Sequence, residues 1–215
     1  MENVKELIGT YETKKEEIKD QLGKFKETLN QSDKRVFGEL AFCLCTPQSK
    51  AVDAWSAISR LIGNGLLYSG DEKGIRPFLN SVRFADNKIK YIVKAREFFT
   101  ENGKIKIKDK INSFDSSFKL RDFLVKDIKG IGMKEAGHFI RNIGFDYTNQ
   151  LAILDRHILK NLKGFGIIER LPKTLTRKVY LEIEEKMRKF SEHIKISMYE
   201  LDMLLWSKET GKIFK

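Results

Sequence analysis

Cysteine is nearly absent from this chain of 215 residues, which contains only Cys43 and Cys45. Two cysteines cannot build a disulfide framework, and they cannot hold a four-cysteine metal or iron–sulfur site within the chain. We therefore expect both side chains to be buried core thiols, without a redox or metal-binding role.

Long apolar runs and strand-like alternation are also missing. No run approaches the roughly 18 apolar residues of a membrane span, and residues 1–21 mix charged and apolar side chains where a signal peptide would have an apolar core. We expect a cytoplasmic protein with no membrane partner. Alternation is visible only at residues 104–108, which we expect to form a loop.

Positive charge is what the sequence has in excess. The 41 Lys and Arg residues against 30 Asp and Glu give a net charge of +11 and a pI near 9.5. Clustered cations favour a polyanionic partner, because their binding releases counterions from phosphates. Solubility is the alternative explanation, and charge alone does not decide between the two. With 41% hydrophobic and 33% charged residues, the composition is that of a folded globular protein.

Apolar residues at helical spacing cover most of the chain and predict an all-α protein. Short connections containing glycine or proline separate the segments, and we find no low-complexity linker and no solenoid repeat. A change of domain is most easily placed in the polar, lysine-rich residues 103–117. The predicted helices cover residues 1–28, 34–45, 50–62, 75–81, 87–102, 118–128, 134–143, 156–164, 173–190 and 191–206.

Two of these helices flank a short segment in which Gly130 and Gly132 alternate with other residues. Glycine allows positive φ and close approach of another backbone, and the start of the second helix offers free amide N–H groups. We interpret the segment as a seat for a DNA phosphate. A tight helix–helix turn is the alternative.

Lys134 and Asp155 are the candidate catalytic residues. Lys134 falls in the first helical turn, where the positive end of the helix dipole disfavours an ammonium group, and a neutral amine is what attack on a sugar carbon requires. Alone, a lysine at this position is more often a surface or phosphate-contacting residue. Asp155 follows 21 residues later, at the start of another helix. A helix N-cap is its alternative role, contributing about 1 kcal/mol, but the same carboxylate could stabilise positive charge developing on a deoxyribose.

At these residues the chain resembles the helix–hairpin–helix DNA glycosylases, whose signature is Gly-x-Gly-x-Lys followed by an aspartate about twenty residues later. It looks most like the archaeal-type 8-oxoguanine DNA glycosylase/AP lyases, which lack the iron–sulfur cluster of endonuclease III. The similarity runs from about Phe37 to Lys215 and is most specific at residues 130–136, residues 153–157 and the C-terminal tail. Lys129 is a departure, because many superfamily members have proline there; it adds a cation to the phosphate seat.

The resemblance implies two helical domains, one of residues 31–117 and one of residues 1–30 plus 118–215, with the hairpin and Asp155 facing the cleft between them. It implies that Lys134 attacks the anomeric carbon of a flipped nucleotide, expels 8-oxoguanine and forms a Schiff base that permits β-elimination. Asp155 would stabilise the cation-like transition state.

The resemblance also implies how the base is recognised. The last residue, Lys215, would distinguish 8-oxoguanine from guanine, and Trp206 would stack on the extruded base. Phe84 is a candidate second wall of the pocket, and Gln48 would fill the gap that the nucleotide leaves. The alternatives are a frayed terminus for Lys215, core packing for Trp206, ordinary interhelix packing for Phe84 and helix capping for Gln48.

The expected partner is double-stranded DNA containing 8-oxoguanine or abasic sites, bound by a monomer. No cofactor is expected, although the superfamily often binds a monovalent cation through hairpin carbonyls, here those of Lys126, Ile128 and Ile131. His138 and His157 lack a third donor for a metal, so we expect them to be structural or to contact phosphate. In a prokaryote the protein would be cytoplasmic and associated with the nucleoid. Rival functions are a glycosylase for another oxidised base, a non-catalytic DNA-binding module and an RNA-binding helical protein.

Overall fold

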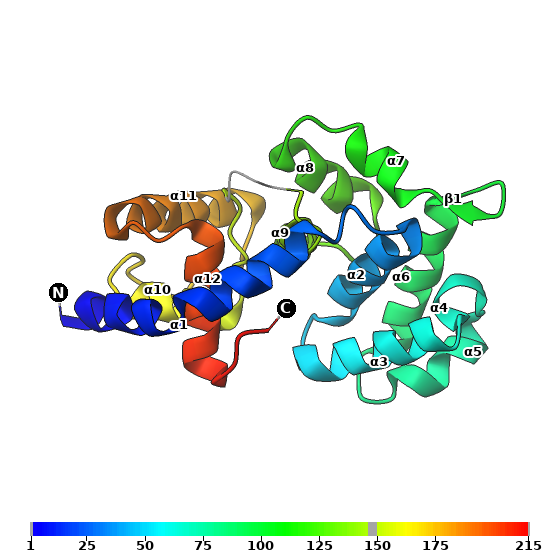
Figure 1. The fold of residues 1–215 in the computed structure, drawn as a ribbon, viewed down its shortest axis with the longest axis horizontal. Helices are drawn as coiled ribbons and strands as arrows, with labels where there is room; N and C mark the ends of the chain where they lie inside the picture. Colours follow the sequence, from blue (N-terminus) through cyan, green and yellow to red (C-terminus); the bar gives the residue numbers. More distant parts are fainter. Residues whose placement is uncertain (1, 146–149, 215) are drawn as a thin grey trace. The chain divides into compact units, whose positions relative to one another are not determined.

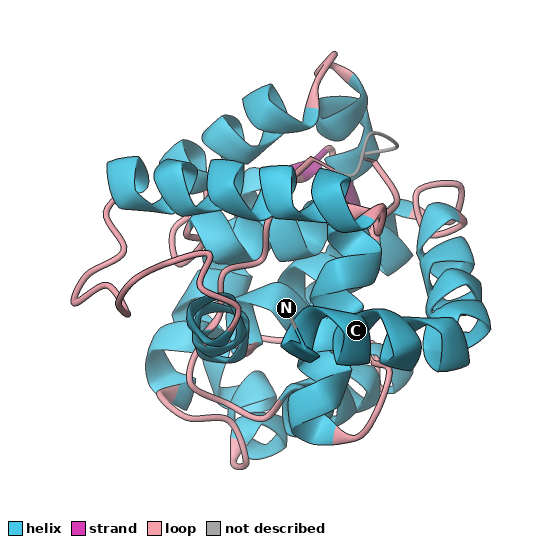
Figure 2. Ribbon diagram, turned by 90° about the vertical axis from the view of Figure 1, so that its left-hand side faces the viewer, coloured by secondary structure: helices cyan, strands magenta, loops and turns pink. Residues whose placement is uncertain are grey.

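Helices form nearly all of the regular structure, which confirms the all-α prediction (Figures 1 and 2). The computed structural model describes residues 2–145 and 150–214. Its elements are α1 (Glu2–Lys26), α2 (Asp33–Cys45), α3 (Ala51–Gly63), α4 (Leu66–Ser69), α5 (Glu72–Ile75), the 3₁₀ helix η1 (Arg76–Leu79), α6 (Ala85–Phe98), β1 (Thr100–Glu101), β2 (Lys104–Ile105), α7 (Ile107–Asn112), α8 (Ser117–Asp127), α9 (Met133–Asn142), α10 (Arg156–Gly164), α11 (Arg177–Ile194) and α12 (Met198–Thr210).

The chain divides into two compact units, residues 27–145 and residues 1–26 together with 146–215. In the second of these, α12 packs against α1, α10 and α11, so the two ends of the sequence share one core (Figure 1). The hydroxyl of Tyr11 in α1 donates a hydrogen bond to Glu200 Oε1 in α12, at 3.0 Å. Glu200 also completes a capping box with Ser197, which fixes the start of α12.

The 27–145 unit is organised around α2, which packs against α3, α6, α7 and α9. Every residue of α2 from Val36 to Cys45 is buried. The ring of Phe42 lies edge-on to His138 of α9, with the ring centroids 5.4 Å apart. A buried amide of Asn142, at the end of α9, donates to Glu39 Oε2 at 3.3 Å. These contacts attach α9 firmly to the centre of the unit.

The boundary between the units therefore differs from the predicted division, in which residues 118–215 belonged with the N-terminal helix. Because α9 packs on α2 and α8 packs on α9, the whole helix–hairpin–helix segment belongs to the 27–145 unit. The chain does not change units in residues 103–117 either. There Ile107 and Ile111 of α7 are buried and α7 packs on α2.

Some helix boundaries also differ from the predicted ones. The break predicted between residues 190 and 191 falls later, because α11 continues to Ile194 and ends at Lys195, which has φ 56°. The helix predicted at 75–81 is instead α5 followed by a 3₁₀ turn, in which proline lacks the N–H that an α-helix would need. Residues 104–105 form a strand paired with β1, although we expected a loop.

Among the described helices, none combines the length and the apolar character that crossing a membrane requires.

Candidate active site

Gly130 is the point at which the chain turns from α8 toward α9. Its φ is 97°, a conformation that side chains with a Cβ rarely adopt. A Cβ built on this residue would lie 2.4 Å from Cδ2 of Tyr91, so the tyrosine ring occupies the space that any other residue would need. The turn therefore requires glycine here for two separate reasons.

Gly132 has a different role from the one we predicted for both glycines. Its φ of −103° and ψ of −177° are extended backbone open to any residue. A Cβ there would meet only Glu135 Oε2, at 3.0 Å, which is the far end of a flexible side chain. Gly132 is the N-cap of α9 and has no side chain to accept the first N–H groups of the helix. The exposed Lys129 lies in the same turn.

Lys134 lies in the first turn of α9, as predicted. Its Nζ is 2.9 Å from Oε1 of Glu135, and both side chains are partly shielded from solvent, with 24% and 12% of their surface exposed. Glu135 is a charge partner that we did not single out from the sequence. Its position directly after Lys134 was the available signal, since a carboxylate is favoured in the first helical turn.

A second lysine, Lys88 of α6, lies near this pair. Its side chain is buried, and Nζ donates hydrogen bonds to the carbonyls of Cys45 (2.7 Å) and Pro47 (2.6 Å) and to Ser49 Oγ (3.0 Å). Burial lowers the pKa of Lys88, and the nearby positive charge of Lys134 lowers it further. The sequence held a signal for Lys88, because it lies on the same helical stripe as the buried residues Ala85 and Ile92.

Gln48 and Phe84 lie on two loops next to Lys88. Both are exposed, Phe84 with 56% of its surface, and both have positive φ, 55° and 56°. The guanidinium of Arg83 lies over the Phe84 ring, 5.6 Å from its centroid. This exposure contradicts the interhelix-packing alternative for Phe84 and leaves the aromatic side chain available to a ligand.

Asp155 begins α10 and is its N-cap, with Oδ1 accepting the N–H of Ile158 at 2.8 Å. Two buried side chains of α11 hold the segment before it. Tyr180 donates its hydroxyl to the carbonyl of Ala152 (2.6 Å), and Glu184 Oε1 accepts the N–H of Ala152 (2.7 Å). We did not identify Tyr180 or Glu184 from the sequence, although their spacing places them on one face of a helix.

Asp155 belongs to the unit of residues 1–26 and 146–215. The other predicted site residues of that unit are His157, Trp206 and Lys215. His157 Nδ1 lies 3.6 Å from Glu209 Oε2, so this histidine faces a carboxylate of its own unit. A hydrogen bond from Lys160 to Glu209 holds the pKa of that carboxyl below its usual value. Trp206 is partly exposed and stacks on Phe214, with ring centroids 6.4 Å apart. Lys215 lies outside the described residues.

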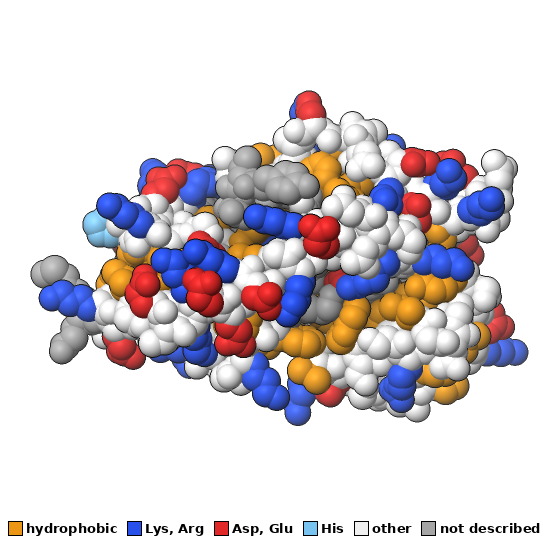
Figure 3. Space-filling model, in the orientation of Figure 1, with side chains coloured by type: hydrophobic (Ala, Val, Ile, Leu, Met, Phe, Trp, Pro, Cys, Tyr) orange, Lys and Arg blue, Asp and Glu red, His pale blue; other side chains and the backbone are white. Residues whose placement is uncertain are grey.

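The predicted site residues are thus distributed over both units. Gln48, Phe84, Lys129, Gly130, Gly132 and Lys134 belong to the 27–145 unit, whereas Asp155, His157 and Trp206 belong to the other unit. Figure 3 shows lysine and arginine side chains spread over the visible face together with acidic ones.

Both cysteines are buried, as predicted, and neither is in a disulfide. Burial raises the pKa of the Cys45 thiol to about 12. Within residues 2–145 and 150–214, no three His, Cys, Asp or Glu side chains are grouped to hold a metal ion. Of the three carbonyls considered for a monovalent cation, that of Ile128 accepts the N–H of Ile131 at 3.1 Å.

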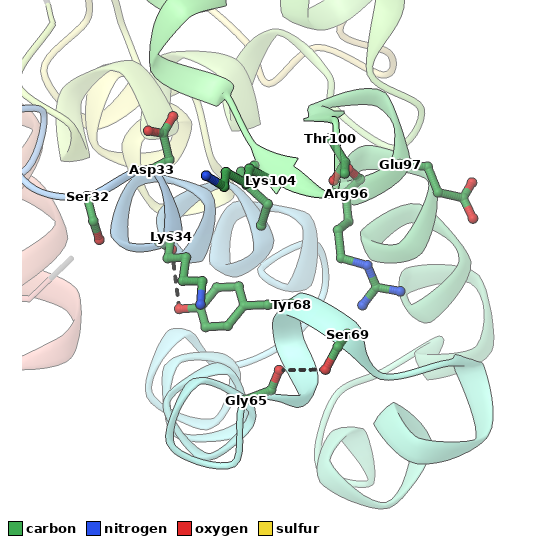
Figure 4. A pocket seen from close by; sticks show the side chains of 12 residues that line it. Ser32, Asp33, Lys34, Gly65, Tyr68, Ser69, Arg96, Glu97, Thr100 and Lys104 are labelled. Carbon is green, nitrogen blue, oxygen red and sulfur yellow. Dashed lines mark hydrogen bonds between the residues drawn. The ribbon is translucent and has the colours of Figure 1, made fainter.

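A broad hollow of about 1070 Å³ lies elsewhere on the 27–145 unit (Figure 4). Its described lining residues include none of the predicted site residues. Arg96 donates to the carbonyls of Leu67 and Gly70, at 3.2 and 2.8 Å, and the Tyr68 hydroxyl donates to the carbonyl of Lys34. These polar groups support the local fold, so the hollow is not our candidate site.

The chain is similar to known proteins in sequence and in fold. A family model described as "8-oxoguanine DNA glycosylase" matches residues 18–196. An 8-oxoguanine DNA glycosylase/AP lyase of Fusobacterium nucleatum is 48% identical over 211 residues, covering 98% of this chain and 96% of that protein.

Two solved structures are also similar. The Methanocaldococcus jannaschii 8-oxoguanine glycosylase/lyase, in complex with a 15mer DNA containing 8-oxoguanine, has a TM-score of 0.90 and 35% identity, covering 100% of both chains. The 8-oxoguanine DNA glycosylase of Thermotoga maritima has a TM-score of 0.85 and 32% identity, covering 100% of this chain and 99% of that one. With the glycine hairpin, Lys134 and Asp155 all present, this chain belongs to the 8-oxoguanine DNA glycosylase family.

Proposed function

We propose that this protein removes 8-oxoguanine from double-stranded DNA and then nicks the strand as an AP lyase. The observation that carries the proposal is the Lys134 amine in the first turn of α9, directly after the glycine hairpin, in a chain of this family. Abasic duplexes are then substrates for the lyase step, and we propose that the protein acts as a monomer.

Lys134 is the proposed nucleophile. The amine must lose a proton before it attacks, and Glu135 Oε1 at 2.9 Å is a base within transfer distance. Attack at the anomeric carbon breaks the glycosidic bond, and the base leaves with its electron pair and takes up a proton. The amine adduct loses its extra proton, and the sugar ring opens as the C1′–O4′ bond breaks and O4′ takes up a proton, which leaves an iminium. The iminium loses a proton at the neighbouring sugar carbon, and the 3′ phosphate leaves by β-elimination. Lys134 is released when water hydrolyses the remaining imine.

The start of α9 is the proposed anchor for the DNA backbone. First-turn N–H groups without a capping side chain favour a phosphate oxygen, and Lys129 adds a positive charge. The phosphate contact would hold the sugar near Lys134, which offsets part of the few kcal/mol required to extrude a nucleotide. The hairpin carbonyls of Lys126, Ile128 and Ile131 remain a proposed monovalent-cation site, on which no step depends.

A duplex containing one 8-oxoguanine, beside a matched guanine duplex, tests the function. We expect free 8-oxoguanine, a nicked strand and a borohydride-trapped adduct only with the lesion duplex. Binding without cleavage would instead indicate a non-catalytic DNA-binding module. Efficient excision of oxidised pyrimidines but not of 8-oxoguanine would indicate a glycosylase for another lesion.

Asp155→Asn should separate chemistry from stability. Asparagine caps helices about as well as aspartate, so we expect the free energy of unfolding to change by less than about 0.5 kcal/mol. Loss of the negative charge near the developing cation should lower the excision rate roughly 100- to 1000-fold. Single-turnover excision and urea unfolding measure the two effects.

Asp155→Ala is the matched variant for the cap, because it also loses the hydrogen bond to Ile158. It should be less stable than Asp155→Asn by about 1 kcal/mol and no more active. Wild-type excision by Asp155→Asn would show that the residue is only a helix cap.

Removal of Lys215 should weaken selection of the lesion. We propose that this residue contacts a group that distinguishes 8-oxoguanine from guanine, and loss of one such hydrogen bond should reduce the preference about tenfold. The ratio of excision rates on paired 8-oxoguanine and guanine duplexes measures it. Lys212→Met, which removes a charge from the same tail, is the control. An unchanged ratio after removal of Lys215 would assign the discrimination to other residues.

A further inference from the structure

Two loops of the 27–145 unit each hold a non-glycine residue at positive φ. Gln48 lies between α2 and α3, and Phe84 lies directly before α6. Such backbone is strained when the residue has a Cβ, and it persists only where surrounding contacts enforce it. Both side chains are exposed, so their own packing is not the source of that constraint.

The buried ammonium of Lys88 constrains the first loop. Its three acceptors lie on both sides of Gln48, and together they use all three ammonium hydrogens. The first acceptor, the carbonyl of Cys45, belongs to the last residue of α2, where the helix dipole also favours a cation. One side chain of α6 therefore fixes the end of α2 and the connection that follows it.

Ser49 extends the same constraint to the second loop. Its Oγ accepts the N–H of Arg83 at 3.0 Å in addition to the Lys88 ammonium, which fills both lone pairs of the hydroxyl. The carbonyl of Phe84 accepts the N–H groups of Asn87 (3.1 Å) and Lys88 (3.2 Å). Phe84 is thus held on both sides, and the two loops are joined through one hydroxyl and one ammonium.

We infer that Lys88 and Ser49 are positioning residues that lock the Gln48 and Phe84 loops together in the arrangement in which these two side chains meet DNA. The inference rests on the proposed function, and it assigns Lys88 no contact with the reacting atoms. Because the loops are already linked in the free protein, gap filling by Gln48 and base stacking by Phe84 require little further ordering on binding.

Lys88→Met and Ser49→Ala test this role, with Lys94→Met as the matched loss of an exposed charge on the same helix. Borohydride trapping on an abasic duplex, carried to completion, first counts the active molecules, because an endpoint count does not depend on the rate. Per active molecule, we expect Lys88→Met to lower single-turnover 8-oxoguanine excision between about 10- and 100-fold. Ser49→Ala should act in the same direction by a smaller factor, and Lys94→Met should match the wild type.

The same substitutions in a Gln48→Ala/Phe84→Ala background decide between positioning and general structural support. If Lys88 acts through these two side chains, Lys88→Met has little further effect once they are truncated. An equal loss in both backgrounds, or a wild-type rate in Lys88→Met, would overturn the inference. If Lys88→Met gives no active protein, Ser49→Ala in both backgrounds decides by the same comparison. Failure of the wild type to excise 8-oxoguanine would instead overturn the proposed function itself.

Discussion

Lys134→Gln is expected to form no borohydride-trapped adduct with an 8-oxoguanine duplex and to excise the base at least about 1000-fold more slowly than the wild type. Glutamine is similar in length, but its amide nitrogen is not a nucleophile. Its side chain can still accept or donate a hydrogen bond beside Glu135, so the start of α9 should remain folded. Gel analysis of trapped DNA and single-turnover excision measure the two effects.

Lys129→Gln is the matched control, because it removes a cation from the same turn but keeps the proposed nucleophile. We expect it to weaken DNA binding. The slope of the logarithm of the binding constant against the logarithm of the salt concentration should decrease by the amount that about one phosphate contact contributes. The variant should still form the trapped adduct. A trappable adduct with Lys134→Gln would place the nucleophile on another residue.

Gly130→Ala is expected to have the largest effect on stability. Its φ of 97° and the 2.4 Å approach of a Cβ to the Tyr91 ring both oppose any side chain. We expect the free energy of unfolding to fall by about 2–5 kcal/mol, with loss of DNA binding by the displaced hairpin. Urea unfolding measures the first effect, and binding to a lesion duplex measures the second.

Two comparisons separate the causes of that loss. Gly9→Ala, in open space on α1, should stabilise the protein by about 0.5–1 kcal/mol, because glycine is unfavourable within a helix. Adding Tyr91→Ala to Gly130→Ala should remove the collision but not the strain of positive φ. If Gly130→Ala unfolded at the wild-type urea concentration, the turn would tolerate a side chain and our account of it would be wrong.

Much of the fold could be predicted from local patterns. The amphipathic periodicity of α2, α3, α9 and α10 placed those helices within a residue or two of their observed bounds. The break between α11 and α12 was predicted too early in the chain, because its position depends on Lys195 adopting a left-handed conformation, which composition does not indicate. The β1–β2 pair did carry a signal, because Asn102-Gly103 is a dipeptide typical of hairpin turns.

The same distinction between local patterns and long-range packing applies to the residues of the candidate site. Gly130, Lys134 and Asp155 belong to one sequence pattern with a fixed spacing, so the sequence was sufficient to single them out. Lys88 and Ser49 are 39 residues apart, and their contact exists only once α6 has packed against α2. The unit boundary differs from the expected one for the same reason, because it depends on which helix α9 packs against. Long-range packing is what periodicity in a single sequence does not encode.

The buried thiols have a consequence for the conditions in which the protein works. Peroxides react with the thiolate form of cysteine, and a pKa of about 12 leaves Cys45 almost entirely protonated at neutral pH. Both sulfurs are also out of reach of solvent. An oxidant that converts guanine to its 8-oxo form therefore meets neither cysteine as a thiolate exposed to solvent.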